Sequence, residues 1–378
     1  MGDGNSVVII GAGVMGLGVA WQLSKAGRRV IVLEKNTPGS GASRAAAGML
    51  APMAELQYDE APLLEFSMAS QKRWPSFVQE LEADAGTSVE YETSGTLLVA
   101  WDRDEADDLK RHYEYQKSVG MQVEWLSGRG LRRLEKMLSP RIVSGVHCAD
   151  DVQVSNRRYV EALEAAARAQ GADIRTGVEV QRLIYEDDKV LGVETTQDEK
   201  IYAEMTVVAA GAWSHALQIP ARVPLHIRPV KGQMMALQMD PKAPLLRHVI
   251  RRRLEGVYLV PKSDGTLVVG GTSEEMGFDD RITAYGLRHL LEHAFEIVPG
   301  IDELPVKETW VGFRPAGRDS GPLLGRSSVP GLAMITGHFR HGIQLSPLSI
   351  DVVTAAILND ELPQIAQAFD PKRFESPI

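Results

Sequence analysis

The stretch from Val7 to Gly16, VVIIGAGVMG, joins an apolar strand pattern to a glycine-rich turn and then to an apolar helical pattern. Gly11 would allow the tight turn, and Gly13 would let the main chain approach a pyrophosphate where a side chain would clash. Gly16 would let the following helix pack closely against the strand. The N–H groups and the positive end of that helix would then face the phosphates, so the stretch predicts a dinucleotide-binding turn.

Two further segments narrow the expected ligand. The apolar run from Val30 to Leu33 ends in Glu34, about 20 residues beyond the turn, where a carboxylate can accept hydrogen bonds from a ribose diol. The segment GSGASRAAAGM follows at residues 39–49. A strand before the glycines, a helix after them and an acid at this distance predict an adenine dinucleotide, and segment 39–49 favours FAD over NAD.

Length, composition and charge bound the class of protein. The 378 residues suggest two domains, and 44% hydrophobic with 24% charged residues is ordinary for a soluble globular protein. The net charge of −9 disfavours nucleic acid as a main partner, because no basic excess is available to replace counterions. The single cysteine, Cys148, excludes an internal disulfide and fits a reducing compartment. We therefore expect a cytoplasmic protein.

The apolar stretch from Val7 to Leu23 also looks like the hydrophobic region of a signal peptide. Residues 1–6 contain Asp3 and no Lys or Arg, whereas a signal peptide starts with basic residues. No other run approaches the roughly 18 apolar residues of a membrane span. The sequence thus favours a dinucleotide turn over a targeting signal and predicts no transmembrane segment.

Hydrophobic periodicity predicts the remaining elements. Helical spacing is found at residues 63–81, 102–117, 159–170, 286–298 and 347–358. Strand patterns are found at residues 89–91, 95–100, 173–176, 178–183, 190–195, 200–203, 205–210, 228–237, 257–261, 266–271 and 332–336. The buried run before Gly211 is typical of a parallel sheet, whereas residues 228–271 are typical of antiparallel strands.

These patterns predict an α/β fold in two parts. A Rossmann-like FAD-binding domain would be discontinuous, comprising residues 1–85, 145–218 and 310–378. An antiparallel β-rich (α+β) substrate-binding domain would be inserted, comprising residues 86–144 and 219–309. Such a division places a pocket at the domain interface, where ligands commonly bind.

Several motifs, spread over nearly the whole chain, resemble the D-amino-acid oxidase superfamily of FAD-dependent amine oxidases, and within it the glycine oxidases of thiamine biosynthesis. They are SRAAAGML at 43–50, YLVP at 258–261, GTLVVG at 265–270, GFRP at 312–315, DSGP at 319–322 and GHFRHGI at 337–343. The resemblance implies that the Rossmann-like domain is of the glutathione-reductase type.

The resemblance also implies a role for each matching residue. Tyr258, Arg314 and Arg340 would bind the substrate, and no catalytic acid or base is named, because the flavin performs the hydride transfer. The residues expected to contact FAD are Gly11, Gly13, Val14, Met15, Gly16, Glu34, Lys35, Ala42, Ser43, Ala47, Gly48, Met49, Val178, Gly211, His338, Phe339, Arg340, His341, Gly342, Ile343 and Gln344. A covalent flavin would need a cysteine in the C-terminal part, which the sequence lacks, so we expect non-covalent FAD and no metal.

The chemistry of these residue types agrees with those roles. A guanidinium matches a carboxylate because two parallel N–H donors meet two oxygens, and a tyrosine hydroxyl adds a third donor. With the carboxylate held, the Cα–H would be aimed at flavin N5, and the flavin supplies the hydride chemistry. We expect glycine, or another small amino acid or N-methyl amine, to give an oxo acid, ammonia or an amine, and hydrogen peroxide when molecular oxygen takes the electrons.

The sequence leaves alternative functions open. The same fold could serve a D-amino-acid or secondary-amine dehydrogenase that passes electrons to a quinone or partner protein, or a non-catalytic FAD-binding subunit. Arg314 could instead form a surface salt bridge, Arg340 could support the backbone, and Tyr258 could be a core aromatic. Gly256 and Ser273 stand where some glycine oxidases have His and Met, which predicts a pocket open to substrates bulkier than glycine. The sequence does not determine the oligomeric state, and a homo-oligomer is one option.

Three other features have simple structural interpretations. His289 and His293, in HLLEH, fit an inverted zinc-protease pattern, but an exposed or half-buried helix face is the favoured interpretation. The run Arg251-Arg252-Arg253 is interpreted as a solvated loop or an interface, and Cys148 as a small buried side chain.

Overall fold

The glycine turn links strand β1 (Ser6–Ile10) to helix α1 (Val14–Lys25), which is followed by β2 (Arg29–Glu34). Gly11 has φ of +102°, and a Cβ on it would lie 2.6 Å from the Ala209 carbonyl oxygen. A Cβ on Gly16 would lie 1.9 Å from the Gly11 carbonyl oxygen, so the helix packs on the turn more closely than any side chain would allow.

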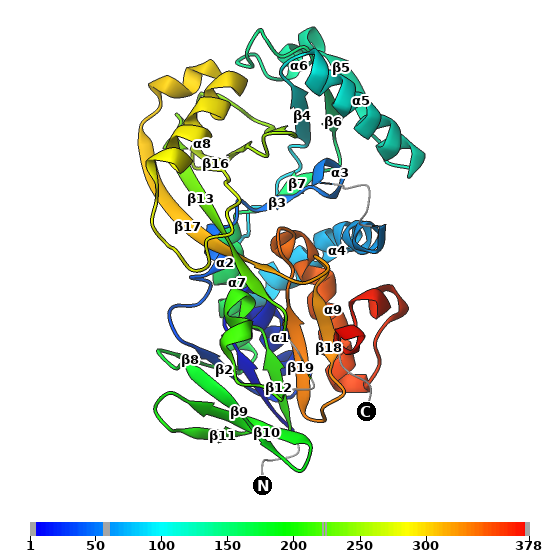
Figure 1. The fold of residues 1–378 in the computed structure, drawn as a ribbon, viewed down its shortest axis with the longest axis vertical. Helices are drawn as coiled ribbons and strands as arrows, with labels where there is room; N and C mark the ends of the chain where they lie inside the picture. Colours follow the sequence, from blue (N-terminus) through cyan, green and yellow to red (C-terminus); the bar gives the residue numbers. More distant parts are fainter. Residues whose placement is uncertain (1–4, 56–60, 221–222, 224, 375–378) are drawn as a thin grey trace.

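The computed structural model describes residues 5–55, 61–220, 223 and 225–374. Residues 1–4, which entered the signal-peptide argument, lie outside this range. The chain forms two lobes, each built on its own large sheet, with the N- and C-termini in the same lobe (Figure 1).

The lobe that carries the termini contains a six-stranded sheet in the order β18-β19-β12-β1-β2-β8. Neighbouring strands are parallel except at the edge pair β18–β19, which is antiparallel. Besides β1 and β2, the strands are β8 (Asp173–Thr176), β12 (Met205–Val208), β18 (Leu323–Arg326) and β19 (Leu332–Thr336). The start, middle and end of the chain thus share one sheet, and the predicted Rossmann-like α/β class is confirmed.

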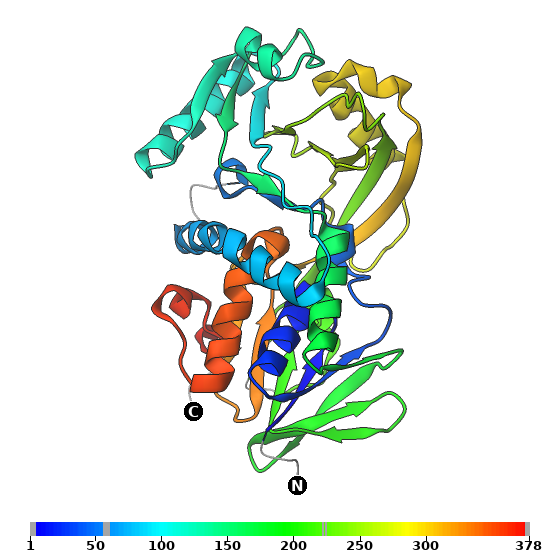
Figure 2. The same cartoon turned by 180° about the vertical axis from the view of Figure 1, so that it is seen from behind.

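Alternate residues of β1 pack into two different hydrophobic cores, one on each face of the sheet. Val7 and Ile9 pack with the helices on one face, whereas Val8 and Ile10 pack with a small sheet on the other face. The helices seen in front of the sheet in Figure 2 are α1, α4 (Ala61–Ala85), α7 (Asn156–Ala169) and α9 (Gly342–Asn359). The small sheet is β9 (Val180–Glu186), β10 (Lys189–Thr195) and β11 (Lys200–Tyr202).

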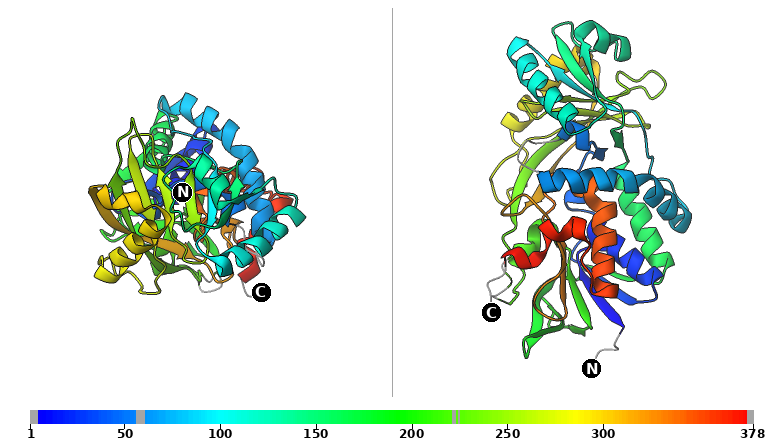
Figure 3. Two further views of the ribbon diagram at one scale, coloured as in Figure 1. Left: turned by 90° about the horizontal axis from the view of Figure 1, so that it is seen from above. Right: turned by 90° about the vertical axis from the view of Figure 1, so that its right-hand side faces the viewer.

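The second lobe is the predicted β-rich part. Its eight strands lie in the order β17-β13-β16-β15-β14-β4-β6-β5, antiparallel except for the parallel pair β14–β4. The strands are β4 (Thr96–Ala100), β5 (Glu124–Ser127), β6 (Ser144–Cys148), β13 (Arg228–Gln238), β14 (Val249–Arg252), β15 (Tyr258–Pro261), β16 (Thr266–Gly270) and β17 (Val306–Ala316). Helices α5 (Arg103–Ser118), α6 (Gly128–Leu134) and α8 (Ala284–Ile297) lie beside this sheet (Figure 3).

The remaining elements are short. They are α2 (Ala42–Ala45), α3 (Pro52–Glu55), the β3 (Met49–Leu50) and β7 (Val152–Gln153) pair, and the 3₁₀ helices Gly211–Ala216, Pro299–Glu303, Gln364–Phe369 and Pro371–Phe374. The long strands β13 and β17 pair along their whole length and extend from one lobe to the other (Figure 1).

The expected domain boundaries at 145 and 310 fall inside strands of the large sheet. Residue 145 lies in β6 and residue 310 in β17, and the strands that pair with β6 and β17 all belong to the large sheet. Ala316, at the end of β17, also makes an isolated bridge to His338 of the other lobe. We therefore propose boundaries just after Cys148 and Ala316, which keep each strand within one sheet.

Two local predictions were wrong. Residues 89–91 do not form a strand: Glu90 has φ of +54°, and only Glu92 makes an isolated bridge, to Gln153. Helix α9 begins at Gly342 rather than at Pro347. Pro347 has no N–H to donate to the carbonyl of Ile343, four residues earlier. That carbonyl accepts a hydrogen bond from the Ser346 hydroxyl instead.

Helix α9 is long and apolar enough to cross a membrane by length and composition alone. Over its 18 residues, however, 61% of the helix is buried inside the protein, where it packs against α1, α4 and β19. A buried core helix of a soluble protein passes the same test, so α9 is weak evidence for a membrane span.

Candidate FAD and substrate site

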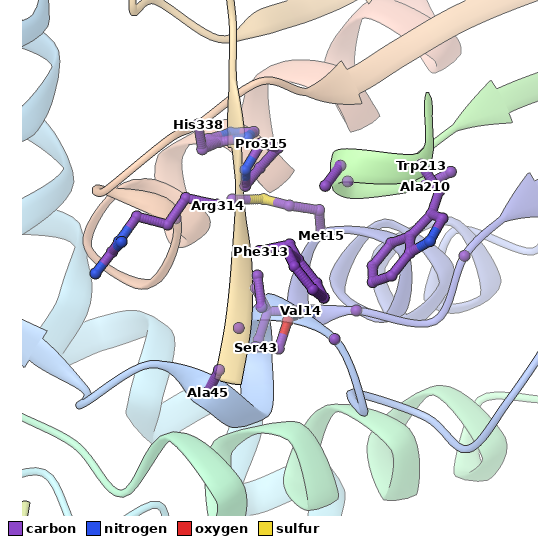
Figure 4. Close-up of a pocket in the computed structure, with 18 of the residues that line it drawn as sticks. Val14, Met15, Ser43, Ala45, Ala210, Trp213, Phe313, Arg314, Pro315 and His338 are labelled. Carbon is purple, nitrogen blue, oxygen red and sulfur yellow. Dashed lines mark hydrogen bonds between the residues drawn. The ribbon is translucent and has the colours of Figure 1, made fainter. Parts of the chain in front are cut away.

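A cavity of about 820 Å³ lies where the two lobes meet. It extends from the glycine turn and the end of β2 to strands β15 and β17, so both sheets contribute to its wall (Figure 4). Its volume is in the range of small-molecule and cofactor sites.

The cavity brings together most of the residues expected to contact FAD. Those that line it are Gly11, Gly13, Val14, Met15, Glu34, Lys35, Ala42, Ser43, Ala47, Gly48, Met49, Val178, Gly211, His338, Phe339, Arg340, Gly342 and Ile343. All three expected substrate residues, Tyr258, Arg314 and Arg340, line it as well. Residues more than 300 positions apart in the sequence therefore meet at one site.

Three expected contacts lie away from the cavity wall. Gly16 packs against the turn, as described above. The His341 side chain lies 3.3 Å from the Glu55 carboxylate through its Nδ1. The Gln344 amide is buried and donates to the Ser67 carbonyl. Both side chains therefore point into the protein, His341 toward Glu55 at the end of α3 and Gln344 toward Ser67 in α4.

The nucleotide end of the cavity carries the donors and acceptors that the sequence predicted. Glu34 accepts from the Ala12 N–H at 2.8 Å through Oε2 and from the Asn36 N–H at 2.9 Å through Oε1. Each carboxylate oxygen can accept a further hydrogen bond. The Val14 N–H, at the start of α1, donates to Ser43 Oγ at 3.1 Å. A bare glycine turn, a helix N-terminus, a hydroxyl and a carboxylate are the groups that a pyrophosphate and a ribose require, so these residues fit an adenine dinucleotide.

Aromatic residues that were not predicted also line this cavity. Trp213 lies beneath Lys35 Nζ, 4.6 Å from its ring centroid, and stacks on Phe278 at 5.1 Å. Phe313 closes the cluster, 5.1 Å from Phe278. Figure 4 shows Phe313 and Arg314 on opposite sides of strand β17. The alternation of side chains along a strand would have predicted that Phe313 and Arg314 point to opposite sides. That prediction requires the strand itself, and β17 was not predicted.

His338 also lines the cavity, next to the turn that leads into α9. Its Nε2 lies 3.0 Å from Ser349 Oγ, and the ring is 3% exposed. Burial lowers the pKa of His338 to about 3, and the neighbouring His341 acts in the same direction. His338 is therefore neutral at physiological pH.

Tyr258 and Arg314, which the sequence predicted to bind the substrate, line the cavity together. Arg314 Nη1 donates to the Thr272 carbonyl at 2.9 Å, which holds the guanidinium over Gly232 and Gly271. The Tyr258 hydroxyl contacts Met234 Sδ at 3.5 Å. Burial raises the pKa of Tyr258, while the Arg314 charge opposes that rise, so the phenol remains a protonated hydrogen-bond donor.

The interpretation of the run 251–253 as a solvated loop or interface was wrong for Arg251 and Arg252, whereas Arg253 lies in the turn that follows β14. Arg251 lines the cavity and its Nη1 donates to Glu55 at 2.5 Å. Arg252 is 6% exposed and pairs with Glu105 and Glu296. The one signal in the sequence that these arginines continue a buried strand is the apolar pair at 249–250, directly before the run.

Glu55 is the acidic partner of Arg251. Burial by itself would raise the pKa of Glu55, but Arg251, His341 and Arg340 together hold that pKa well below its usual range. Glu55 therefore carries a negative charge at neutral pH.

The remaining sequence motifs lie outside the cavity. The rings of His289 and His293 are 4.6 Å apart on α8, and His293 contacts Glu255 and Glu296. Among the described residues, no group of three or more His, Cys, Asp or Glu is placed to hold a metal ion. Cys148 is fully buried in β6, as predicted, and burial raises the pKa of its thiol.

The fold and the cavity together define a dinucleotide-dependent oxidoreductase of two lobes. The family model for DAO-type FAD-dependent oxidoreductases matches residues 6–356, so the chain belongs to that family, and the predicted FAD cofactor is confirmed. The predicted resemblance is confirmed as well. A glycine oxidase of Geobacillus kaustophilus is 34% identical over 366 residues, which cover 96% of this chain and 94% of that protein.

Two further comparisons agree. The crystal structure of glycine oxidase from Geobacillus kaustophilus superimposes with a TM-score of 0.91 at 32% identity, covering 98% of this chain and 99% of that one. The bifunctional protein ThiO/ThiG of Trichormus variabilis is 33% identical over 98% of this chain and 55% of its own length. The chain thus spans about half the length of the bifunctional relatives that it matches.

Proposed function

We propose that this protein catalyses the FAD-dependent oxidation of a small amino acid or N-substituted glycine. The products would be an oxo acid and ammonia or an amine, with molecular oxygen reduced to hydrogen peroxide. The observation that carries the proposal is the position of Arg314 and Tyr258 at one end of a cavity whose other end holds the glycine turn and Glu34.

The substrate residues would act by binding and orientation. The Arg314 guanidinium offers planar N–H donors to a carboxylate, and the protonated Tyr258 hydroxyl adds another. Arg340 adds a second positive charge on the same cavity wall. A carboxylate held in this way would present its neighbouring carbon in one orientation, which is how a protein makes a reaction between bound groups effectively intramolecular.

When bound, FAD supplies the electron-accepting chemistry. We assign no general base. The lowered pKa of His338, about 3, makes its imidazole a weak base, Tyr258 keeps its proton, and an amine that binds unprotonated needs no base.

The relatives support the same substrate class. The Geobacillus protein and its crystal structure are named glycine oxidases, and the ThiO half of the bifunctional relatives corresponds to this chain. We propose that the protein acts in the cytoplasm and that its product serves thiamine synthesis. The single buried Cys148 is compatible with a reducing compartment.

The proposal is tested by mixing the FAD-loaded protein with glycine, sarcosine, D-alanine and L-alanine under nitrogen and following the flavin absorbance. We expect at least one of these to bleach the flavin, and hydrogen peroxide to form in proportion to substrate when air is admitted. Bleaching followed by reoxidation only by a quinone or dye would indicate the dehydrogenase instead. No bleaching by any carboxylate-bearing amine would exclude the proposal.

A further inference from the structure

Lys262 places a positive charge in the interior of the protein, next to the cavity. It directly follows strand β15, which carries Tyr258, and its side chain is half-buried. The ammonium donates to Gln153 Oε1 at 3.0 Å and to the Val154 carbonyl at 2.9 Å. Because Gln153 and Val154 are only 1% and 0% exposed, the charged end of the lysine lies against interior groups.

The ammonium also lies against the backbone of Gly48, which lines the cavity. A Cβ built on Gly48, where φ is +79°, would come within 3.2 Å of Lys262 Nζ. The Gly48 carbonyl accepts a hydrogen bond from the Val154 N–H at 2.9 Å, so the lysine and this segment of the cavity wall share one hydrogen-bonded neighbour. Lys262 does not itself line the cavity, and the Gly48 backbone therefore separates its charge from a bound ligand.

The flavin ring of a bound FAD would lie beside residues 47–49. The glycine turn and Glu34 form the nucleotide end of the cavity, and the ring is attached to the pyrophosphate on the other side from the adenosine. Ala47 packs in one apolar cluster with Met234, and Tyr258 packs against the same cluster. Because the ring must reach the substrate, it would lie between the glycine turn and this cluster, where residues 47–49 line the cavity.

The Lys262 charge is not neutralised by a direct ion pair. Both acceptors of its ammonium are neutral, and none of the carboxylates that the structure describes pairs with it directly. Burial lowers the pKa of Lys262 to about 8, whereas three more distant carboxylates raise that pKa. Lys262 therefore carries a positive charge at pH 7. The carboxylates that face it are those of Glu92, of Glu90, which also pairs with Arg158, and of Asp264, which also pairs with Lys307.

We propose that Lys262 stabilises negative charge on the bound flavin ring and thereby favours its reduction. The ammonium acts across the backbone of Gly48 and does not touch the ring, so Lys262 is a positioning residue. A positive charge held in a region of low dielectric stabilises a nearby negative charge, and charge close to the ring is one means by which a protein tunes a flavin. This inference requires FAD but is independent of which amine is oxidised.

Sulfite binding measures this effect without an amine substrate. Sulfite adds to flavin N5, where its electron pair forms the N–S bond and leaves one negative charge on the ring, and the addition bleaches the flavin. In the FAD-loaded protein at pH 7 we expect Lys262→Gln to raise the sulfite dissociation constant by about tenfold or more, roughly 1.4 kcal/mol. Lys262→Arg keeps the charge and should stay close to the wild type.

Lys189→Gln is the matched control, because it removes an exposed lysine of β10 that does not line the cavity. Its sulfite dissociation constant should equal that of the wild type. FAD titration checks that each variant folds and loads the cofactor. An unchanged sulfite dissociation constant in Lys262→Gln would overturn the inference, and so would equal weakening in Lys262→Gln and Lys262→Arg or a wild-type flavin that sulfite does not bleach.

The pH dependence of the wild type decides the matter if Lys262→Gln does not fold. The wild type loses the Lys262 charge as the pH rises through the pKa of this group, whereas Lys262→Arg stays charged. Relative to Lys262→Arg, the wild-type sulfite dissociation constant should therefore rise by about five- to tenfold between pH 7 and pH 9.5. Titration of sulfite, of the flavin and of other side chains is common to both proteins and cancels in this ratio. A ratio that does not change with pH would overturn the inference.

Discussion

The guanidinium of Arg314 lies against Gly232 on the neighbouring strand, where a Cβ would come within 2.6 Å of Arg314 Nη1. Gly232 on β13 pairs with Gly312 on β17, two residues before Arg314. The absence of a side chain at Gly232 therefore creates the space in which the guanidinium rests and donates to the Thr272 carbonyl.

We expect Gly232→Ala to displace this guanidinium and to lower kcat/KM for the amine substrate on the order of 10- to 100-fold, because small misplacements of an orienting group are costly. FAD affinity should not change. Steady-state kinetics measures kcat/KM, and FAD titration measures the affinity for the cofactor. Gly130→Ala is a suitable control, since a Cβ there meets its nearest described atom at an ordinary 3.5 Å. Unchanged kinetics in Gly232→Ala would contradict the role of Arg314.

Arg314→Ala should abolish most substrate binding while the protein stays yellow. Loss of one member of a buried charge pair costs on the order of 2–5 kcal/mol, which is about 30-fold or more in kcat/KM. Arg326→Ala removes an arginine that pairs with Asp360 outside the cavity and should have no kinetic effect. If Arg314→Ala retained wild-type kcat/KM, Arg314 would not contact the substrate.

Glu34→Gln should weaken FAD binding about tenfold or more, because an amide has one acceptor oxygen where the carboxylate has two. In the structure both oxygens are engaged, by the Ala12 and Asn36 N–H groups. The dissociation constant from flavin fluorescence quenching is the measurement. Glu186→Gln, at an exposed position at the end of β9, provides the comparison. Equal affinities in the two variants would argue against Glu34 at the ribose.

Arg252→Met should destabilise the protein by about 3–5 kcal/mol, because it leaves Glu105 buried without its main partner. The Arg252 and Glu105 side chains are only 7% and 10% exposed. Arg253→Met breaks a more exposed pair with Asp108 and should cost about 0–1 kcal/mol. Urea denaturation of both variants measures the free energy of unfolding that each one loses. Similar losses in the two variants would show that the Arg252–Glu105 pair does not behave as a buried ion pair.

His338 should make stability depend on pH. Its pKa is lowered to about 3 in the folded protein, so between that value and the ordinary 6.5 the unfolded chain binds a proton that the folded protein does not. The stabilisation is complete above pH 6.5 and is lost as the pH falls. From pH 7.5 to 5 we expect this group to remove about 2 kcal/mol from the free energy of unfolding.

Urea denaturation at the two pH values measures this loss in the wild type and in His338→Gln, which cannot titrate. The variant should lose about 2 kcal/mol less than the wild type over the same interval. Equal losses in the two proteins would mean that His338 does not stay neutral in the folded state.

The sequence alone determined the cofactor and the fold class, since both depend on local chemistry. The positive φ of Gly11, the close packing of Gly16 and the carboxylate of Glu34 each act within one β-α-β unit, so their spacing in the chain is enough to predict them. The motifs around Tyr258, Arg314 and Arg340 placed three distant segments at one site by resemblance, and the cavity does contain all three.

Only the tertiary structure decided what each arginine of the run 251–253 does. Arg251 lines the cavity, Arg252 joins a buried cluster with Glu105 and Glu296, and Arg253 pairs with Asp108. Because the three side chains are identical and adjacent, the local sequence does not show which of them lines the cavity and which forms an ion pair. The roles of Arg251 and Arg252 follow from the register of β14 between β4 and β15, and Arg253 begins the turn after that strand. The register depends on long-range pairing, which a single sequence does not reveal.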